Sequence, residues 1–180
     1  MILTNCAACA APLAHDHKKK CSRCKTTQSN LAITYGKLGR VEQALQIERD
    51  VYSGRRKLQG DEHAATLQAA FNYAVDLVKL NHFEEAKALL RELIPVSRRV
   101  LGESHDLTIR MRWILGEALY RDDGATFDDL REAVTTLEDT ERIARRVRGG
   151  AHPLTGDIEW GLGEARAALR ARETPSRGSA

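Results

Sequence analysis

The sequence predicts an all-α protein: a solenoid of about three helix-turn-helix repeats and a capping helix, preceded by a small Cys-rich segment. The first observation is a pattern of Gly, two residues, His, two residues and Thr, which returns after 42 and then 47 positions. A fixed period in this range is typical of a repeat array. The second observation is that apolar residues follow a helical period within each repeat. The three copies of the pattern are Gly60 to Thr66, Gly102 to Thr108 and Gly149 to Thr155.

Length and composition indicate a globular chain without a membrane span. The chain has 180 residues, of which 42% are hydrophobic and 29% charged, and its formal net charge is +3. This mild charge lacks the concentrated basic surface of a dedicated nucleic-acid binder. No apolar run is long enough to cross a bilayer, and we recognise no signal peptide at the N-terminus. We therefore expect a cytoplasmic protein, with the nucleus as the alternative.

Residues 1–28 form the predicted Cys-rich segment, which contains all four cysteines as two CxxC pairs. Two such pairs can complete a closed tetrahedral Zn²⁺ shell, which would be structural rather than catalytic. The segment resembles the first half of a MYND-type zinc finger, but the later ligands of that finger are absent. Three interpretations stay open: one structural zinc ion, a degenerate finger without metal, and a redox or disulfide role. The candidate ligands are Cys6, Cys9, Cys21 and Cys24.

Residues 29–171 carry the predicted repeats, each a pair of helices, A and B. We expect repeats at about 29–65, 66–107 and 108–154, a capping helix at 155–172 and a disordered tail at 173–180. Thr66 and Thr108 are the expected N-caps of two A helices. Pro95 predicts a bend or break in the second B helix. The third B helix should span about Phe127 to Val147. The capping helix should pack onto the third repeat through Ile158, Trp160, Leu162, Ala165 and Leu169.

Small residues recur where the two helices of a repeat must approach closely. Ala32, Ala74 and Gly116 occupy one column of the A helices, and Ala44, Ala86 and Ala133 occupy one column of the B helices. This arrangement resembles the tetratricopeptide repeat. The 42-residue period, Asn30-Leu31-Ala32 with Tyr35, and His152-Pro153 with Thr155 resemble the kinesin light chain type. The resemblance implies a protein-binding scaffold with a concave groove lined by A helices.

The residues expected to line that groove are chosen by their position relative to the small-residue column. In the resembled family, the Asn of Asn-Leu-Ala helps to grip a peptide backbone, and Asn30 and Asn72 match it. Lys and Arg side chains at neighbouring positions favour an acidic peptide as partner. The candidate peptide-binding residues are Asn30, Ile33, Lys37, Asn72, Val75, Lys79, Arg110, Ile114, Glu117 and Arg121.

Other functions are less favoured by the sequence. The three repeated histidines lie one repeat apart, which favours a structural role in the turns over a shared catalytic or metal site. No nucleophile elbow, phosphate-binding loop or HExxH motif is present, so we predict no enzyme. The alternative function is a zinc-dependent nucleic-acid or chromatin-associated module that uses the basic Cys-rich segment. The sequence leaves the partner protein and the oligomeric state open.

Overall fold

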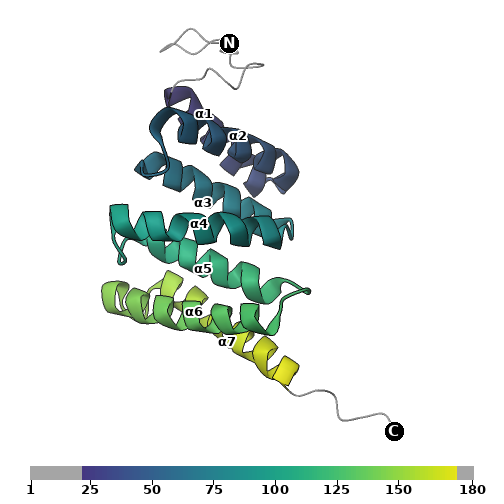
Figure 1. Ribbon diagram of the computed structural model, residues 1–180. Coiled ribbons are helices and arrows are strands. Elements are labelled where there is room, and N and C mark those ends of the chain that lie inside the picture. Colours follow the sequence, from purple (N-terminus) through teal and green to yellow (C-terminus); the bar gives the residue numbers. More distant parts are fainter. Residues whose placement is uncertain (1–21, 174–180) are drawn as a thin grey trace. The chain divides into compact units, whose positions relative to one another are not determined.

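The computed structural model describes residues 22–173, with side chains from Lys25 onward, and confirms the predicted all-α fold. The described residues form seven α-helices and no strand (Figure 1). The helices are α1 (Ser22–Lys37), α2 (Val41–Gln59), α3 (Ala64–Lys79), α4 (Phe83–Leu101), α5 (Asp106–Arg121), α6 (Phe127–Arg148) and α7 (Pro153–Glu173). None of these helices is long and apolar enough to cross a membrane.

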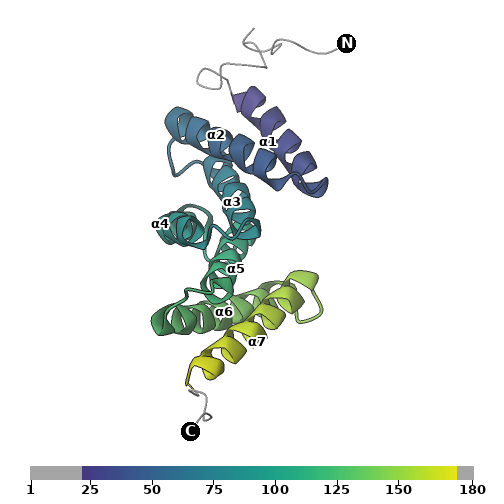
Figure 2. The same cartoon turned by 90° about the vertical axis from the view of Figure 1, so that its right-hand side faces the viewer.

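The chain divides into two compact units, Met1–Leu80 and Asn81–Ala180. In unit 1, α2 packs against both α1 and α3. In unit 2, α5 packs against α4 and α6, and α7 packs on α6 and part of α5. Within each unit, consecutive helices are joined by short connections (Figure 2).

The small-residue columns lie in the cores of the units, as the sequence predicts. Ala32, Ala44 and Ala74 are fully buried in unit 1, and Ala86 and Ala133 are fully buried in unit 2. A Cβ on Gly116 would lie 2.6 Å from the Leu137 side chain, so only glycine permits this approach of α5 and α6. Fully buried Leu67, Leu77, Leu90, Leu119 and Leu137 fill the space around the columns. Burial of each of these side chains stabilises the fold by about 1.5–3 kcal/mol.

The Gly-x-x-His pattern ends one helix and begins the next. Gly60, Gly102 and Gly149 have φ of 77°, 99° and 86°, a region that favours glycine. Each donates its backbone N–H to a carbonyl in the last turn of α2, α4 or α6. These bonds satisfy carbonyl groups that a helix end otherwise leaves without a partner.

The N-caps of α3 and α5 are histidines, so the prediction of Thr66 and Thr108 as N-caps is wrong. His63 Nδ1 accepts the N–H of Ala65 at 3.1 Å, and His105 Nδ1 accepts that of Leu107 at 3.2 Å. His152 Nδ1 likewise accepts the N–H of Leu154 at 3.1 Å, at the start of α7. The predicted structural role of the repeated histidines in the turns is therefore confirmed.

The repeated threonines lie inside the first turn of these helices, and their environments differ. Thr66 and Thr108 are fully buried, and the Thr108 hydroxyl lies 2.8 Å from that of Ser97 on α4. Thr155 donates its hydroxyl to the carbonyl of Gly149 at 3.0 Å, which closes the turn before α7.

Three further expectations need correction. Helix α1 begins at Ser22, inside the predicted Cys-rich segment. Of the predicted bend or break at Pro95, the break is absent, because helix α4 continues through this residue. Pro95 and Arg91 are both exposed, so the hydrogen bond that proline removes is lost at the surface. Of the residues predicted to pack α7 onto the third repeat, Ile158, Leu162 and Ala165 are buried as expected, whereas Trp160 is 65% exposed and does not contribute.

Candidate functional site

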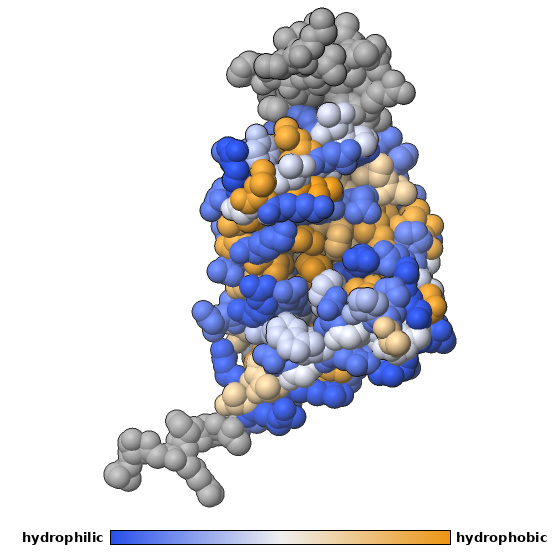
Figure 3. Space-filling model, turned by 180° about the vertical axis from the view of Figure 1, so that it is seen from behind, coloured by the Kyte–Doolittle hydropathy of each residue, from blue (hydrophilic) through white to orange (hydrophobic). Residues whose placement is uncertain are grey.

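The ten predicted peptide-binding residues fall into two sets, one in each unit. Unit 1 holds Asn30, Ile33 and Lys37 on α1 and Asn72, Val75 and Lys79 on α3; unit 2 holds Arg110, Ile114, Glu117 and Arg121 on α5. The face drawn in Figure 3 mixes hydrophobic patches with hydrophilic side chains. Each set therefore has to be judged by the environment of its own side chains.

Helix α1 presents an exposed mixed surface. Asn30, Ile33 and Lys37 are all exposed, and Ile33 keeps 45% of its surface in contact with solvent. The Asn30 side-chain amide and the Lys37 ammonium make no hydrogen bond or ion pair with another described residue. These three side chains therefore offer an amide, an apolar contact and a positive charge to a partner.

Asn72 occupies the same repeat position as Asn30, but its amide is already used inside unit 1. Its Nδ2 donates to Ser29 Oγ at 3.1 Å and to Glu48 Oε1 at 3.2 Å. Its Oδ1 accepts from Gln68 Nε2 at 3.1 Å. Asn72 thus joins α3 to α1 and α2, and a peptide would have to compete with these bonds.

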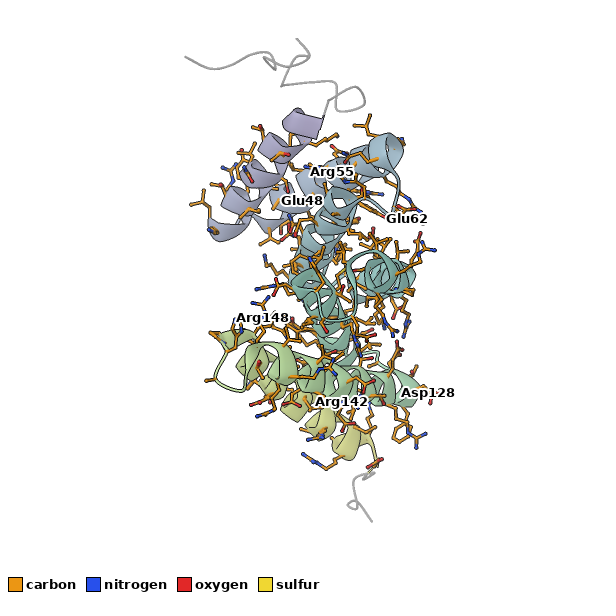
Figure 4. All side chains as sticks on the ribbon, turned by 90° about the vertical axis from the view of Figure 1, so that its left-hand side faces the viewer. Glu48, Arg55, Glu62, Asp128, Arg142 and Arg148 are labelled. Carbon is orange, nitrogen blue, oxygen red and sulfur yellow. The ribbon has the colours of Figure 1, made fainter. Side chains whose placement is uncertain are left out.

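Glu48 is the centre of a buried polar cluster between α1, α2 and α3. It is 1% exposed, and its Oε1 also accepts from Ser29 Oγ at 2.8 Å. Burial raises the pKa of Glu48 to about 7; the hydrogen bonds from Ser29 and Asn72 oppose the rise, as does nearby Arg55, while Asp76 adds to it. Glu48 and Arg55 both come from α2 (Figure 4).

Arg55 and Lys25 extend this polar layer along the α1–α2 contact. Arg55 is 8% exposed and donates to Thr26 Oγ1 at 2.9 Å. Lys25 is 1% exposed and donates to the Asp50 carbonyl at 2.9 Å, and its side chain occupies the space that a Cβ on Gly54 would need. The sequence analysis did not predict this buried polar layer. Its one local sign in the sequence is Gly54, which leaves room for the Lys25 side chain.

The C-terminal ends of α1 and α3 bring basic side chains together. Lys79 Nζ lies 3.8 Å from the position of a Cβ on Gly36, the neighbour of Lys37. Lys79 is 47% exposed in its side chain and pairs with Asp76 at 3.1 Å. Arg40 lies over the ring of Tyr35, 4.6 Å from its centroid. This end of unit 1 is therefore a positively charged edge next to Ile33 and Val75.

The charged candidate residues of unit 2 form ion pairs with neighbouring side chains of opposite charge. Arg110 pairs with Asp106 at 2.7 Å, and Arg121 pairs with Glu117 at 2.6 Å. Ile114 is only 5% exposed, because it contributes to the core rather than to the surface. This set offers less uncompensated charge and less apolar surface than the set on α1.

A second buried ionic group stabilises the loop between α5 and α6. Lys87 is 2% exposed, and its ammonium lies 2.9 Å from Asp122 and within ion-pair distance of Glu84. Burial would lower the pKa of Lys87, but the hydrogen bonds with Asp122 and Glu84 and the nearby carboxylates outweigh it and raise that pKa. The longer third repeat thus has its extra loop tied to α4.

The predicted zinc ligands fall almost wholly outside the described residues. Cys6, Cys9 and Cys21 lie before α1, and Cys24 lies in α1 with its side chain outside the described part. Between residues 25 and 173, no group of three His, Cys, Asp or Glu side chains could hold a metal ion. The zinc site therefore stays a prediction.

Comparisons with known proteins agree with this architecture. Residues 24–99 match the family model described as Tetratricopeptide repeat. The crystal structure of BtubC (BKLC) from P. vanneervenii is similar with a TM-score of 0.63 and 18% identity, over 91% of this chain and 72% of that chain. The search of curated proteins found no match. The tetratricopeptide-type fold is therefore confirmed, whereas the kinesin light chain-like type and the MYND-like segment stay predictions.

Proposed function

We propose that this chain is a non-catalytic binding module that holds a peptide of a partner protein on the A helices of unit 1. Tetratricopeptide repeats generally mediate protein–protein interactions, which supports the class of function. The observation that carries the proposal is the exposed trio of Asn30, Ile33 and Lys37 on α1. The side-chain polar groups of Asn30 and Lys37 are not used by other described residues.

The chemistry of this surface favours an extended peptide with acidic residues. An amide such as that of Asn30 can both donate to and accept from a peptide backbone. Ile33 and half-buried Val75 offer apolar contact for a side chain. Lys37 and the part-exposed Lys79 can form charge-assisted hydrogen bonds with carboxylates. Because exposed ion pairs contribute at most about 1 kcal/mol each, we expect modest affinity and a marked dependence on salt.

The experiment is a binding titration of the full chain with fluorescent decapeptides that carry several Asp and Glu residues, beside peptides with Asn and Gln instead. We expect the acidic peptides to bind more tightly, and both Asn30→Ala and Lys37→Glu to weaken them. Arg142→Glu is the matched control, because Arg142 is 76% exposed in its side chain but lies on α6. Equal binding of both peptide classes, or unchanged binding by the two α1 variants, would refute the proposal.

A further inference from the structure

The peptide surface proposed on unit 1 has a buried carboxyl group directly behind it. Oε1 of Glu48, on α2, accepts hydrogen bonds from Asn72 Nδ2 of α3 at 3.2 Å and from Ser29 Oγ of α1 at 2.8 Å. Asn72 is one of the candidate peptide-binding residues, and Ser29 is the chain neighbour of Asn30. The carboxyl group therefore contacts both helices of the surface, and a peptide that reaches Asn72 lies one side chain away from it.

The other buried charged groups described in unit 1 do not form an ion pair with Glu48. The Lys25 ammonium of α1 donates to a backbone carbonyl of α2, and the Arg55 guanidinium of α2 donates to a hydroxyl of α1, each at 2.9 Å. On α3, buried Asp76 pairs with part-exposed Lys79. Burial raises the pKa of Glu48 to about 7; its two hydrogen bonds and the Arg55 charge oppose the rise, and Asp76 adds to it. Near neutral pH, a small change around Glu48 therefore decides whether it holds its proton.

We propose that protonation of Glu48 and binding of an acidic peptide to α1 and α3 favour each other, so that unit 1 binds its partner more tightly at pH 6 than at pH 8. This coupling rests on the proposed function, because it regulates the same surface. Coupling between two binding events is reciprocal, so a proton that strengthens peptide binding is itself held more tightly once the peptide is bound.

The first contribution comes from the side-chain amide of Asn72. Its bond to an ionised carboxylate is charge-assisted, and such bonds are roughly twice as strong as those between neutral groups. Protonation of Glu48 weakens this bond, so the amide becomes more available to the backbone of a peptide. At low pH a peptide therefore competes against a weaker internal bond than at high pH.

The second contribution is electrostatic. A peptide on this surface displaces water near Glu48 and brings its carboxylates toward Lys79, and both the loss of water and the like charge favour the neutral form of Glu48. Burial also raises the pKa of Asp76, and Lys79 opposes that rise. Because a peptide carboxylate at Lys79 competes with Asp76, binding favours the neutral form of Asp76 as well. Both carboxyl groups therefore act in the same direction.

The size of the effect depends on how far the bound peptide raises the pKa of Glu48 above its value of about 7. A further rise of about one pH unit makes binding about fivefold tighter at pH 6 than at pH 8, and binding then takes up about 0.4 proton at pH 7. Carboxyl groups of the peptide ionise at about pH 4, so their charge is constant across this range.

Isothermal titration calorimetry of the full chain with the acidic decapeptides, at pH 6 and pH 8 and constant ionic strength, tests the coupling. Titrations at pH 7 in phosphate and in Tris, which differ in ionisation enthalpy, give the number of protons taken up. For the natural chain we expect a dissociation constant about fivefold lower at pH 6, and net proton uptake. Glu48→Gln keeps an oxygen for Ser29 and Asn72 and carries no charge at either pH. It should reduce the difference to less than about twofold and remove most of the uptake.

Glu42→Gln is the matched control, because Glu42 is an exposed carboxylate on the same helix. It should keep the pH difference and the proton uptake of the natural chain, with equal helicity by circular dichroism in all three proteins. Acidic peptides that bind equally at both pH values, or a pH difference that Glu48→Gln leaves unchanged, would overturn the coupling while the proposed function stands. If no acidic peptide binds at either pH, the proposed function fails and the coupling fails with it.

Discussion

The buried carboxyl of Glu48 makes the stability of unit 1 depend on pH, and Glu48→Gln tests this dependence. Glu48 is 1% exposed and Oε2 has no hydrogen-bond partner among the described residues. Its neighbours Ser29 and Asn72 both donate to Oε1. Glutamine keeps an oxygen for these two bonds and removes the charge, so the variant isolates the cost of ionisation.

The direction in which stability changes with pH follows from the pKa of Glu48, which burial raises from 4.5 to about 7 in the folded chain. Between these values the folded protein holds a proton that the unfolded chain releases. The stabilising contribution of the protonated carboxyl is therefore complete below pH 4.5 and is lost as the pH rises through about 7. A rise of this size corresponds to about 3 kcal/mol of unfolding free energy, at 1.36 kcal/mol for each pH unit.

Urea unfolding, followed by circular dichroism at pH 5 and pH 8, measures the effect. We expect Glu48→Gln to be more stable than the natural chain by up to about 3 kcal/mol at pH 8 and by less than about 1 kcal/mol at pH 5. Asp76, whose pKa burial also raises, contributes in the same direction, so the pH dependence should shrink rather than vanish.

Glu42→Gln is the control, because Glu42 is an exposed carboxylate on the same helix. It should change stability by at most about 1 kcal/mol through the helix dipole and should leave the pH dependence intact. If Glu48→Gln gave the same stability difference at both pH values, the carboxyl would not be neutral in the fold, and the reasoning would be wrong.

Two further substitutions test the turns and the helix contacts by thermal denaturation. His105→Ala should lower the unfolding free energy by about 1 kcal/mol through loss of the N-cap of α5, and His105→Asn should restore most of it; equal stability of both variants would argue against capping. Gly116→Ala should lower stability by up to about 3 kcal/mol, because its Cβ would overlap Leu137, whereas Gly163→Ala, with open space around it, should raise stability by up to about 1 kcal/mol. A stabilising Gly116→Ala would contradict the close contact of α5 and α6.

The repeat period allowed most of the fold to be predicted, because helix periodicity and glycine positions are local properties. The third B helix was expected at about Phe127 to Val147, and α6 spans Phe127–Arg148. The repeat period could not show whether His or Thr is the N-cap, since both residues recur at the same spacing. Only the backbone geometry places His105 at the cap and Thr108 in the core.

The buried polar layer of unit 1 was missed for a different reason. Lysine, glutamate and asparagine on helices are usually solvated, and the partners that bury them are distant in sequence. Asn72 bonds Ser29, 43 positions away, and Glu48, 24 positions away. Such pairing depends on how three helices meet, which the periodicity of any one helix does not specify.

The two asparagines show why equivalent repeat positions differ in environment. Asn72 follows an earlier helix pair, and that pair supplies Ser29 and Glu48 to satisfy its amide. Among the described residues, no helix pair precedes α1, so Asn30 remains exposed with its amide available. Trp160 has the complementary situation, because no described helix follows α7. The equivalent residue of α5, Trp113, lies close to Gly161 of the later helix α7. In a repeat array, the same residue is therefore structural where a neighbouring repeat covers it and available for binding where none does. The surface proposed on α1 follows from this dependence on neighbours.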